Sequence, residues 1–213
     1  MPGPGCNAVA RLVFRKVAAG EDRRLVQLDR DRPLVEAALR DPAQFDALYR
    51  KYLAQVYSYA YYELGDHHDA EDATERTFLL ALSALPRFEE RARPADGEGA
   101  STFRVWLFQV ARNAVANVRR GRRRHPQVPL EAAAPLPAAL DVELGAVRRD
   151  EARAAWAAVA RLPDDRRRAL VLRFVEEMPT AEIAGILGRS EGAVRVLIHR
   201  GLRAVARDLD RQS

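Results

Sequence analysis

A segment rich in proline and alanine, residues 125–145, divides the chain into two blocks that both show the periodicity of helices. This composition is typical of an interdomain linker, because proline cannot continue a helix. Apolar residues recur every three or four positions on both sides of the segment, and no alternating run predicts a sheet. The sequence therefore predicts an all-α protein of two small helical domains joined by a Pro/Ala-rich linker.

Capping residues and helix breakers locate the helices within each block. In the first block, Phe45–Ala60 shares one apolar face, Asp66 is the predicted N-cap of a helix that ends at Pro86, and a third helix begins near residue 101. The glycines and charges of residues 87–101 predict a flexible loop. In the second block the predicted helices are 146–160, 164–177, 180–187 and 191–209. The domains that follow are an unassigned N-terminal arm 1–32, a first domain 33–124, the linker 125–145 and a second domain 146–213.

The charge balance narrows the class of partner. The 213 residues include 35 basic and 30 acidic side chains, and all but two of the basic ones are arginine. Arginine offers a rigid fork of donors to phosphates and guanine edges, so nucleic acid or another acidic partner is expected. The lone Cys6 excludes an intramolecular disulfide and a cysteine zinc cluster. Neither a signal-peptide core nor a membrane-length apolar run is present, so we expect a cytoplasmic protein without membrane insertion.

Residues 180–194 predict a helix-turn-helix, the unit that places its second helix in the DNA major groove. Gly188 suits the tight turn, and Ser190 can cap the second helix. The candidate DNA-binding residues are Ser190 and the basic residues that project from the non-core faces of the second helix: Arg195, His199, Arg200 and Arg203. The alternative is an ordinary helical hairpin with a solvated basic side.

Charge is segregated within the first domain. Residues 63–78 hold six acidic side chains and one arginine, whereas residues 103–124 hold seven arginines and no acidic residue. Two explanations remain open: solvated faces that attract each other, or two binding surfaces, one for a basic protein and one for nucleic acid. The acidic candidates are Asp69, Glu71, Asp72 and Glu75. The candidates on the basic helix are Trp106, Arg112, Asn113, Arg119 and Arg120. The residues expected to turn that helix toward the core are Phe103, Trp106, Leu107, Val110, Ala114 and Val118.

Both blocks carry motifs of a known family. Three motifs resemble the second conserved region of bacterial sigma factors: Phe45-Asp-Ala-Leu-Tyr49, Ala70-Glu-Asp72 with Thr77-Phe78, and Phe103-Arg-Val-Trp-Leu-Phe108 followed by Val110-Ala-Arg-Asn113. Four more are similar to the fourth conserved region: Leu162-Pro163, Val171-Leu-Arg-Phe174, Ile183-Ala184 and Ser190-Glu-Gly-Ala-Val194. The resemblance covers about residues 34–124 and 146–209, and it is to the short extracytoplasmic-function group.

The resemblance implies an alternative sigma factor that binds core RNA polymerase, directs it to promoters and helps open the DNA, without being an enzyme. It implies that the acidic candidates bind polymerase, that the basic helix binds the minus-ten element as duplex and melted DNA, and that the last helix reads the minus-thirty-five element. An anti-sigma protein is a further implied partner. The sequence departs from the family pattern at Glu75-Arg76, where many members have Gln-Glu, and at Val196-Leu197, where many have Ser-Arg. Its 87–101 loop is also longer than usual.

Two other functions fit parts of the sequence. A stand-alone helix-turn-helix regulator would bind duplex DNA without polymerase, and it would not need the acidic helix. A helical protein–protein adaptor would show little salt-dependent affinity for DNA. No cofactor or metal is expected, because adjacent His67 and His68 point about 100° apart on a helix and chelate poorly. No nucleophile motif or phosphate-binding glycine loop supports an enzyme.

Overall fold

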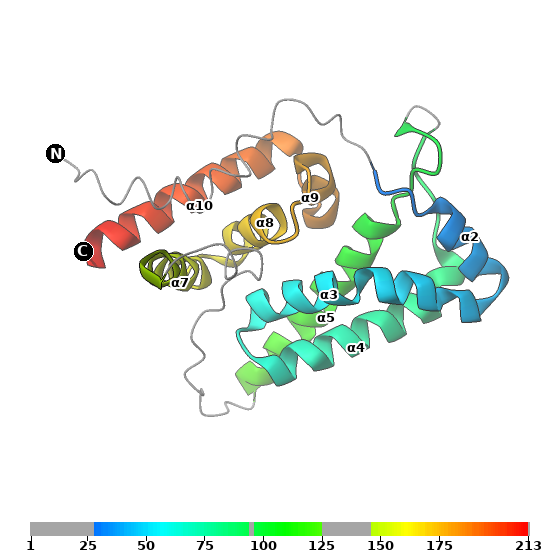
Figure 1. Ribbon diagram of the computed structural model, residues 1–213, viewed down its shortest axis with the longest axis horizontal. Coiled ribbons are helices and arrows are strands. Elements are labelled where there is room, and N and C mark those ends of the chain that lie inside the picture. The colour runs from blue at the N-terminus through cyan, green and yellow to red at the C-terminus, as the bar shows by residue number, and fades with distance from the viewer. Residues whose placement is uncertain (1–27, 94–95, 125–145, 213) are drawn as a thin grey trace. The chain divides into compact units, whose positions relative to one another are not determined.

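The computed structural model describes residues 28–93, 96–124 and 146–212, and every regular element in these ranges is a helix (Figure 1). The described residues fall into two compact units, one on each side of the gap at 125–145. This confirms the predicted all-α class with two helical domains. The predicted arm up to residue 27 and the predicted linker lie outside the described residues.

The first domain is built around three long helices. Its elements are α2 (Arg32–Arg40), the 3-10 turn η1 (Pro42–Gln44), α3 (Phe45–Leu64), α4 (His67–Ala84), the 3-10 turn η2 (Leu85–Arg87) and α5 (Phe103–Arg124). Gly65 ends α3 in the left-handed conformation at φ +71°, which glycine adopts without strain. The Asp66 carboxylate then accepts a hydrogen bond from the Asp69 N–H at 3.0 Å, as predicted for the N-cap of α4.

The core of the first domain lies where α3, α4 and α5 pack against one another. The buried face of α5 differs from the predicted stripe. Phe108, Ala111 and Val115 are buried, whereas Trp106, Val110 and Val118 are only half-buried. The reason is that α5 packs against both α3 and α4, so its buried face is wider than one stripe and is turned away from Trp106. The half-buried indole therefore reaches the surface of the domain.

A buried polar cluster joins the start of the domain to α3. Asp31 is fully buried, and its carboxylate accepts hydrogen bonds from Lys51 and from the Tyr52 hydroxyl. Tyr52 also donates to Asp29 at 2.8 Å, and Arg104 of α5 lies 3.4 Å from the same Asp29 carboxylate. Burial and the two neighbouring carboxylates raise the pKa of Tyr52 far above its usual value, so the hydroxyl stays a donor.

The same segment holds the loop that precedes α5. The Arg32 guanidinium donates to the carbonyl oxygens of Ala92 and Ala100, each at 3.1 Å. The Ser101 N–H donates to the Asp29 carbonyl at 2.8 Å. Residues 29–32 therefore take part in the packing of the first domain, although the sequence places them in the N-terminal arm.

The second domain is a bundle of four helices. They are α7 (Ala146–Ala160), α8 (Asp164–Phe174), α9 (Thr180–Leu187) and α10 (Glu191–Gln212), and α10 packs against each of the other three. Helix α8 ends three residues before its predicted end, because Glu177 takes a left-handed conformation at φ 51° in the turn to α9. Helix α10 lies so close to α8 that a Cβ on Gly201 would come within 3.1 Å of Leu170 Cδ1.

Candidate functional site

Helices α9 and α10 form the predicted helix-turn-helix. Gly188 ends α9 at φ +64°, and its N–H donates to the carbonyl of Ala184. The Ser190 hydroxyl accepts a hydrogen bond from the Ala193 N–H at 3.2 Å, which caps the start of α10. A Cβ on Gly188 would meet open space, so its backbone conformation alone favours glycine. The turn glycine and the serine cap both have their predicted roles.

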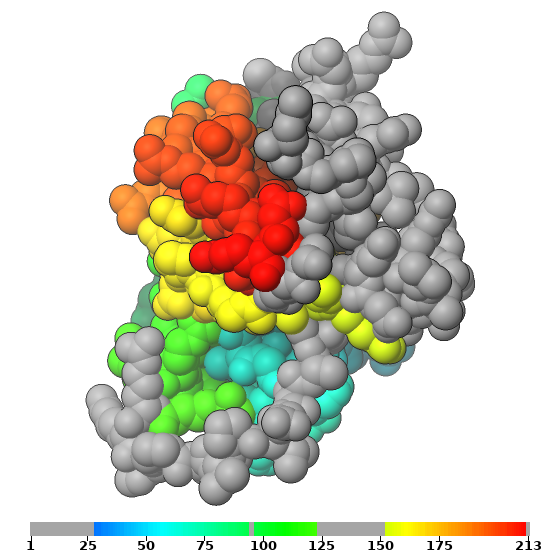
Figure 2. Space-filling view, turned by 90° about the vertical axis from the view of Figure 1, so that its left-hand side faces the viewer, coloured from blue at the N-terminus to red at the C-terminus, as the bar shows by residue number. Residues whose placement is uncertain are grey.

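The outer face of α10 carries the basic candidates of the second domain. Val194 and Val205 are buried, and the side chains on the opposite face are solvent-exposed. Figure 2 shows the last turns of this helix, in red, on the surface. All five predicted residues are exposed: Ser190, Arg195, His199, Arg200 and Arg203. Arg195 pairs with Glu191 at 3.0 Å within the first turns.

The two predicted reading arginines do not share one line of α10. Five residues correspond to about 140° of rotation, so Arg195 and Arg200 stand at opposite edges of the outer face. Val196 lies between them and is 47% exposed. The sequence points to Val196 only as a departure from the family pattern. Its exposure follows from its position on the helix opposite Val194 and Val205.

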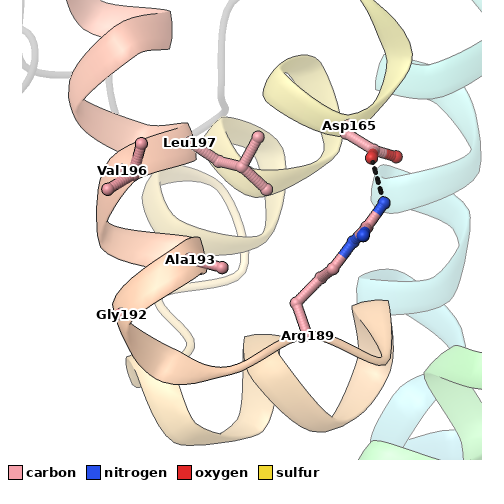
Figure 3. Close-up of a pocket in the computed structure, with 6 residues that line it drawn as sticks. All are labelled: Asp165, Arg189, Gly192, Ala193, Val196 and Leu197. Carbon is pink, nitrogen blue, oxygen red and sulfur yellow. Dashed lines mark hydrogen bonds and ion pairs between the residues drawn. The ribbon is translucent and has the colours of Figure 1, made fainter.

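A shallow hollow of about 390 Å³ opens beside Val196 (Figure 3). Gly192, Ala193, Val196 and Leu197 of α10 line one side of it. Arg189 of the turn reaches across to Asp165 of α8, and their side chains pair at 3.1 Å. The hollow therefore has a largely apolar wall beside a closed ion pair. Sequence reasoning missed it because α8 and α10 come together only in the folded domain.

The acidic helix α4 uses its carboxylates in two different ways. Glu71, Asp72 and Glu75 are exposed. Asp69 instead pairs with Arg122 of α5, which also lies 3.3 Å from Asp66. Burial raises the pKa of Asp69, although the neighbouring Arg122 opposes this shift. Three of the four acidic candidates thus face solvent, and the fourth holds α4 to α5.

The basic candidates of α5 also divide into two groups. Trp106, Asn113 and Arg120 are spaced seven residues apart, so they fall nearly on one line of the helix. Arg120 also donates to the side chain of Asn117. Arg119 turns into the domain, where its guanidinium donates to the backbone and the side chain of buried Glu63.

Arg112, seven residues before Arg119, is half-buried on the side of α5 next to the Trp106 line. The ion pairs between α4 and α5, together with the charged side chains that stay exposed on both helices, support both explanations of the segregated charge. Some charges attract each other across the α4–α5 interface, and others remain on the surface.

The loop before α5 is held against the start of that helix. The Glu90 Oε1 atom accepts hydrogen bonds from the N–H groups of Arg91, Ala92 and Thr102 and from the Thr102 hydroxyl, at 2.8–2.9 Å. Burial alone would raise the pKa of Glu90, but these bonds and one from Ser101 lower it. Sequence reasoning missed Glu90, because its partners lie up to twelve residues away.

An aromatic cluster lies beside Glu90 at the start of α5. The Phe88 ring packs 5.3 Å from the Trp106 ring, and Phe103 lies 5.5 Å from the same indole. The described part of the predicted flexible loop is therefore anchored at Phe88 and Glu90. Among the described residues, no group of acidic, histidine or cysteine side chains could hold a metal ion. No described helix is long and apolar enough to span a membrane.

Two family models match the chain, each within one of the two domains. The sigma-70 region 2 model matches residues 48–125, and the sigma-70 region 4 model matches residues 152–205. The second match contains the helix-turn-helix and the hollow. The first contains the acidic face of α4 and the Trp106 line of α5.

Several RNA polymerase sigma factors are similar over much of their length. ECF sigma factor ShbA of Streptomyces griseus is 34% identical over 139 residues, which are 63% of this chain and 69% of ShbA. ECF sigma factor BldN of Streptomyces coelicolor is 33% identical over 183 residues, 82% of this chain and 64% of BldN. The sigma-H factor of Pseudomonas aeruginosa is 32% identical over 191 residues, 85% of this chain and 94% of that protein.

Two solved structures share the fold. CnrH, solved in complex with the cytosolic domain of CnrY, gives a TM-score of 0.59 at 24% identity and covers 87% of this chain and 100% of CnrH. RpoE from Bartonella quintana, solved with the anti-sigma factor NepR, gives 0.59 at 21% identity and covers 78% of this chain and 96% of RpoE. At these identities the likeness supports the all-helical fold.

Proposed function

Because the chain belongs to the sigma-70 family, in its extracytoplasmic-function group, we propose that it binds core RNA polymerase, directs the enzyme to specific promoters and helps open the minus-ten DNA. In this role it confers specificity and is not itself an enzyme. Its place of action is the cytoplasm, where polymerase works. Family membership, rather than a contact in the structure, supports an anti-sigma protein as a further partner.

The observation that carries the proposal is the sign of the exposed charges on the two domains. The outer face of α4 presents Glu71, Asp72 and Glu75, which suit a basic protein surface. The outer face of α10 presents Arg195, Arg200 and other cations, which suit DNA phosphates and base edges. A protein that joins polymerase to a promoter needs both surfaces in one chain.

The α10 residues are assigned to the minus-thirty-five element. In a helix-turn-helix, base edges are contacted by the first turns of the second helix. Arg195 and His199 lie there on one side of the outer face, and Arg200 lies at its other edge. Ser190 and Arg203 stand before and after this group, where they suit phosphate contacts.

The α5 residues are assigned to the minus-ten element. The Trp106 ring offers a stacking surface to an unpaired base, and the Asn113 amide can hydrogen-bond a base edge. Arg112 and Arg120 supply positive charge for the strand's phosphates. Arg119 is retained in this group, although its contact with Glu63 gives it a structural role as well.

The α4 residues are assigned to polymerase. Glu71, Asp72 and Glu75 are its solvent-facing members, and Asp69 supports them by fixing α4 to α5 through Arg122. Like charges brought together in an interface cost several kcal/mol, so reversing the exposed carboxylates is a sensitive test. Reversing Asp69 would also break an internal ion pair and is less informative.

The test is transcription from a defined promoter by core polymerase with and without this chain. The diagnostic variant is Glu71→Lys with Asp72→Lys, and it should bind core polymerase at least about tenfold more weakly with unchanged helical content. The matched control is Glu36→Lys with Asp46→Lys, which reverses one exposed carboxylate on α2 and one in the first turn of α3. The control should bind like the parent.

Each alternative gives a distinct result. Specific binding to duplex DNA with no dependence on polymerase would identify a stand-alone regulator. Polymerase-independent protein binding without salt-dependent DNA affinity would identify an adaptor. If the chain starts no transcription with core polymerase, the proposed function is wrong. If the α4 double reversal binds polymerase with parental affinity, the acidic face is only a solvated surface.

A further inference from the structure

We propose that Val196 reads the C5-methyl group of a thymine in the minus-thirty-five element. This inference rests on the proposed function and adds a specificity-determining residue to it. The family pattern draws attention to the polar and basic residues of α10. The geometry instead places an apolar side chain at the centre of the face that meets DNA.

The position of Val196 is the first argument. It is the sixth residue of α10 and therefore belongs to the turns that approach base edges in a helix-turn-helix. It lies about 160° around the helix from buried Val194, in the direction of solvent. Among the described residues of the second domain, Val196 is the large apolar residue whose side chain is exposed, at 47%. Other exposed apolar side chains of this size lie in the first domain.

The surroundings of Val196 are the second argument. Its neighbours Gly192 and Ala193 are small, and a Cβ on Gly192 would meet nothing within 4 Å. The helix can therefore come close to a groove without a clash from its own first turn. Arg195 and Arg200 stand on either side of Val196 at angles that suit phosphates or base edges, so the apolar spot is framed by positive charge.

The acidic residue beside the hollow does not oppose an approach to DNA. The Asp165 carboxylate pairs with Arg189 at 3.1 Å and lies 3.8 Å from Arg168 (Figure 3). Its charge is thus compensated before DNA arrives. The apolar wall of the hollow is left as the feature that a base edge would meet.

Base chemistry selects the occupant. In the major groove, thymine presents a C5-methyl group beside its O4 acceptor, whereas the other bases present only hydrogen-bond donors and acceptors. Valine has no polar atom, so it cannot satisfy those donors and acceptors. It gains by burying apolar surface against the thymine methyl. Uracil has the same hydrogen-bonding edge without the methyl group, so it isolates this contact.

The experiment uses the full chain with core polymerase. A promoter library randomised at the minus-thirty-five element is selected by transcription, and each thymine of the selected element is then replaced by uracil. With the parent chain, one replacement should lower promoter affinity about fourfold, the value for burying one methyl group. With Val196→Ala, the ratio of the affinity for the thymine promoter to the affinity for the uracil promoter should fall to near one. Val196→Thr keeps one methyl group at similar size and should retain part of the preference for thymine.

The outcomes separate the contact from a structural role. A Val196→Ala chain that binds all promoters more weakly but keeps the parental thymine-to-uracil ratio would overturn the inference. So would a selected element without a uracil-sensitive thymine. Selection of no promoter at all would instead refute the proposed function itself. Because Val196 is exposed, loss of folding should not obscure the result, and the thermal unfolding of each variant checks this.

Discussion

Replacing Glu90 by glutamine should loosen the loop before α5 while leaving both helical domains folded. The substitution keeps the size of the side chain and removes only its negative charge. The carboxylate now accepts hydrogen bonds from the N–H groups of Arg91 and Ala92 in the loop, and from the N–H and hydroxyl of Thr102 at the start of α5. The change therefore tests whether a single carboxylate holds the loop that precedes the Trp106 helix.

The magnitude follows from the loss of an acceptor for backbone N–H groups. Removing such an acceptor costs about 0.5–2 kcal/mol, as for a helix cap, and bonds to a charged acceptor lie toward the upper end. Glu90 is half-buried, so water replaces part of what is lost. We expect Glu90→Ala to lower the free energy of unfolding of the first domain by about 2 kcal/mol. Glu90→Gln should lower it by about 1 kcal/mol, because the amide oxygen remains an acceptor.

Urea unfolding followed by tryptophan fluorescence measures this change. The chain has two tryptophans, so a Trp156→Phe background leaves Trp106 as the reporter of the first domain. The Trp106 ring lies 5.3 Å from Phe88, two residues before Glu90, and therefore senses the loop directly. Parent and variants are compared in this same background, which cancels the effect of the Trp156 substitution.

The pH dependence gives the sharper test. The pKa of Glu90 is lowered from 4.5 in the folded domain, so its charge contributes stability above that ordinary value. The contribution is lost as pH falls through the lowered pKa, because protonation removes the charge that the donors hold. The difference between parent and Glu90→Gln should therefore be full at neutral pH and shrink in acid. Equal stability at pH 7, or a difference that persists undiminished in acid, would refute this account.

Three further predictions follow from contacts in the two domains. Arg119→Ala should destabilise the first domain by about 3 kcal/mol, because Glu63 is left buried without this cation. Urea unfolding measures the loss of stability, and a loss below about 1 kcal/mol would contradict the structural role of Arg119. Gly201→Ala should lower the stability of the second domain by about 1 kcal/mol in thermal unfolding, because its Cβ would press on a fully buried leucine of α8 at 3.1 Å. Arg195→Ala and Arg200→Ala should differ in promoter-selection profiles, one blurring a base preference at a cost of about 1–3 kcal/mol and the other weakening all promoters alike. Two profiles that match the parent would contradict the last prediction.

Local signals in the sequence were enough to locate most of the helices. Asp66 caps α4 and Ser190 caps α10 through hydrogen bonds to residues three positions away, so both caps could be predicted from nearby residues in the sequence. Gly188, which forms the turn of the helix-turn-helix with a positive φ, could also be predicted from the residues around it. The predicted ends of α7 and α9 agree with the structure because short-range periodicity and breakers fix them.

The use of each charge could not be predicted in the same way. Arg119 and Glu63 are 56 residues apart, and their pairing depends on how α5 packs against α3. Asp69 was expected to face a partner with the other carboxylates, but Arg122 reaches it from another helix. Helical periodicity gives the direction of a side chain around its own axis, and it does not give the residue that lies opposite.

The buried carboxylate of Asp31 has a consequence for anyone who wishes to excise the first domain. The family match begins at residue 48, which would make that position a natural place to cut a fragment. Such a fragment would keep Lys51 and Tyr52 but lose both aspartates that accept their hydrogen bonds. Tyr52 is fully buried, and leaving its hydroxyl without an acceptor costs about 1–3 kcal/mol. A usable fragment must therefore begin at or before Asp29, well outside the segment by which the family is recognised.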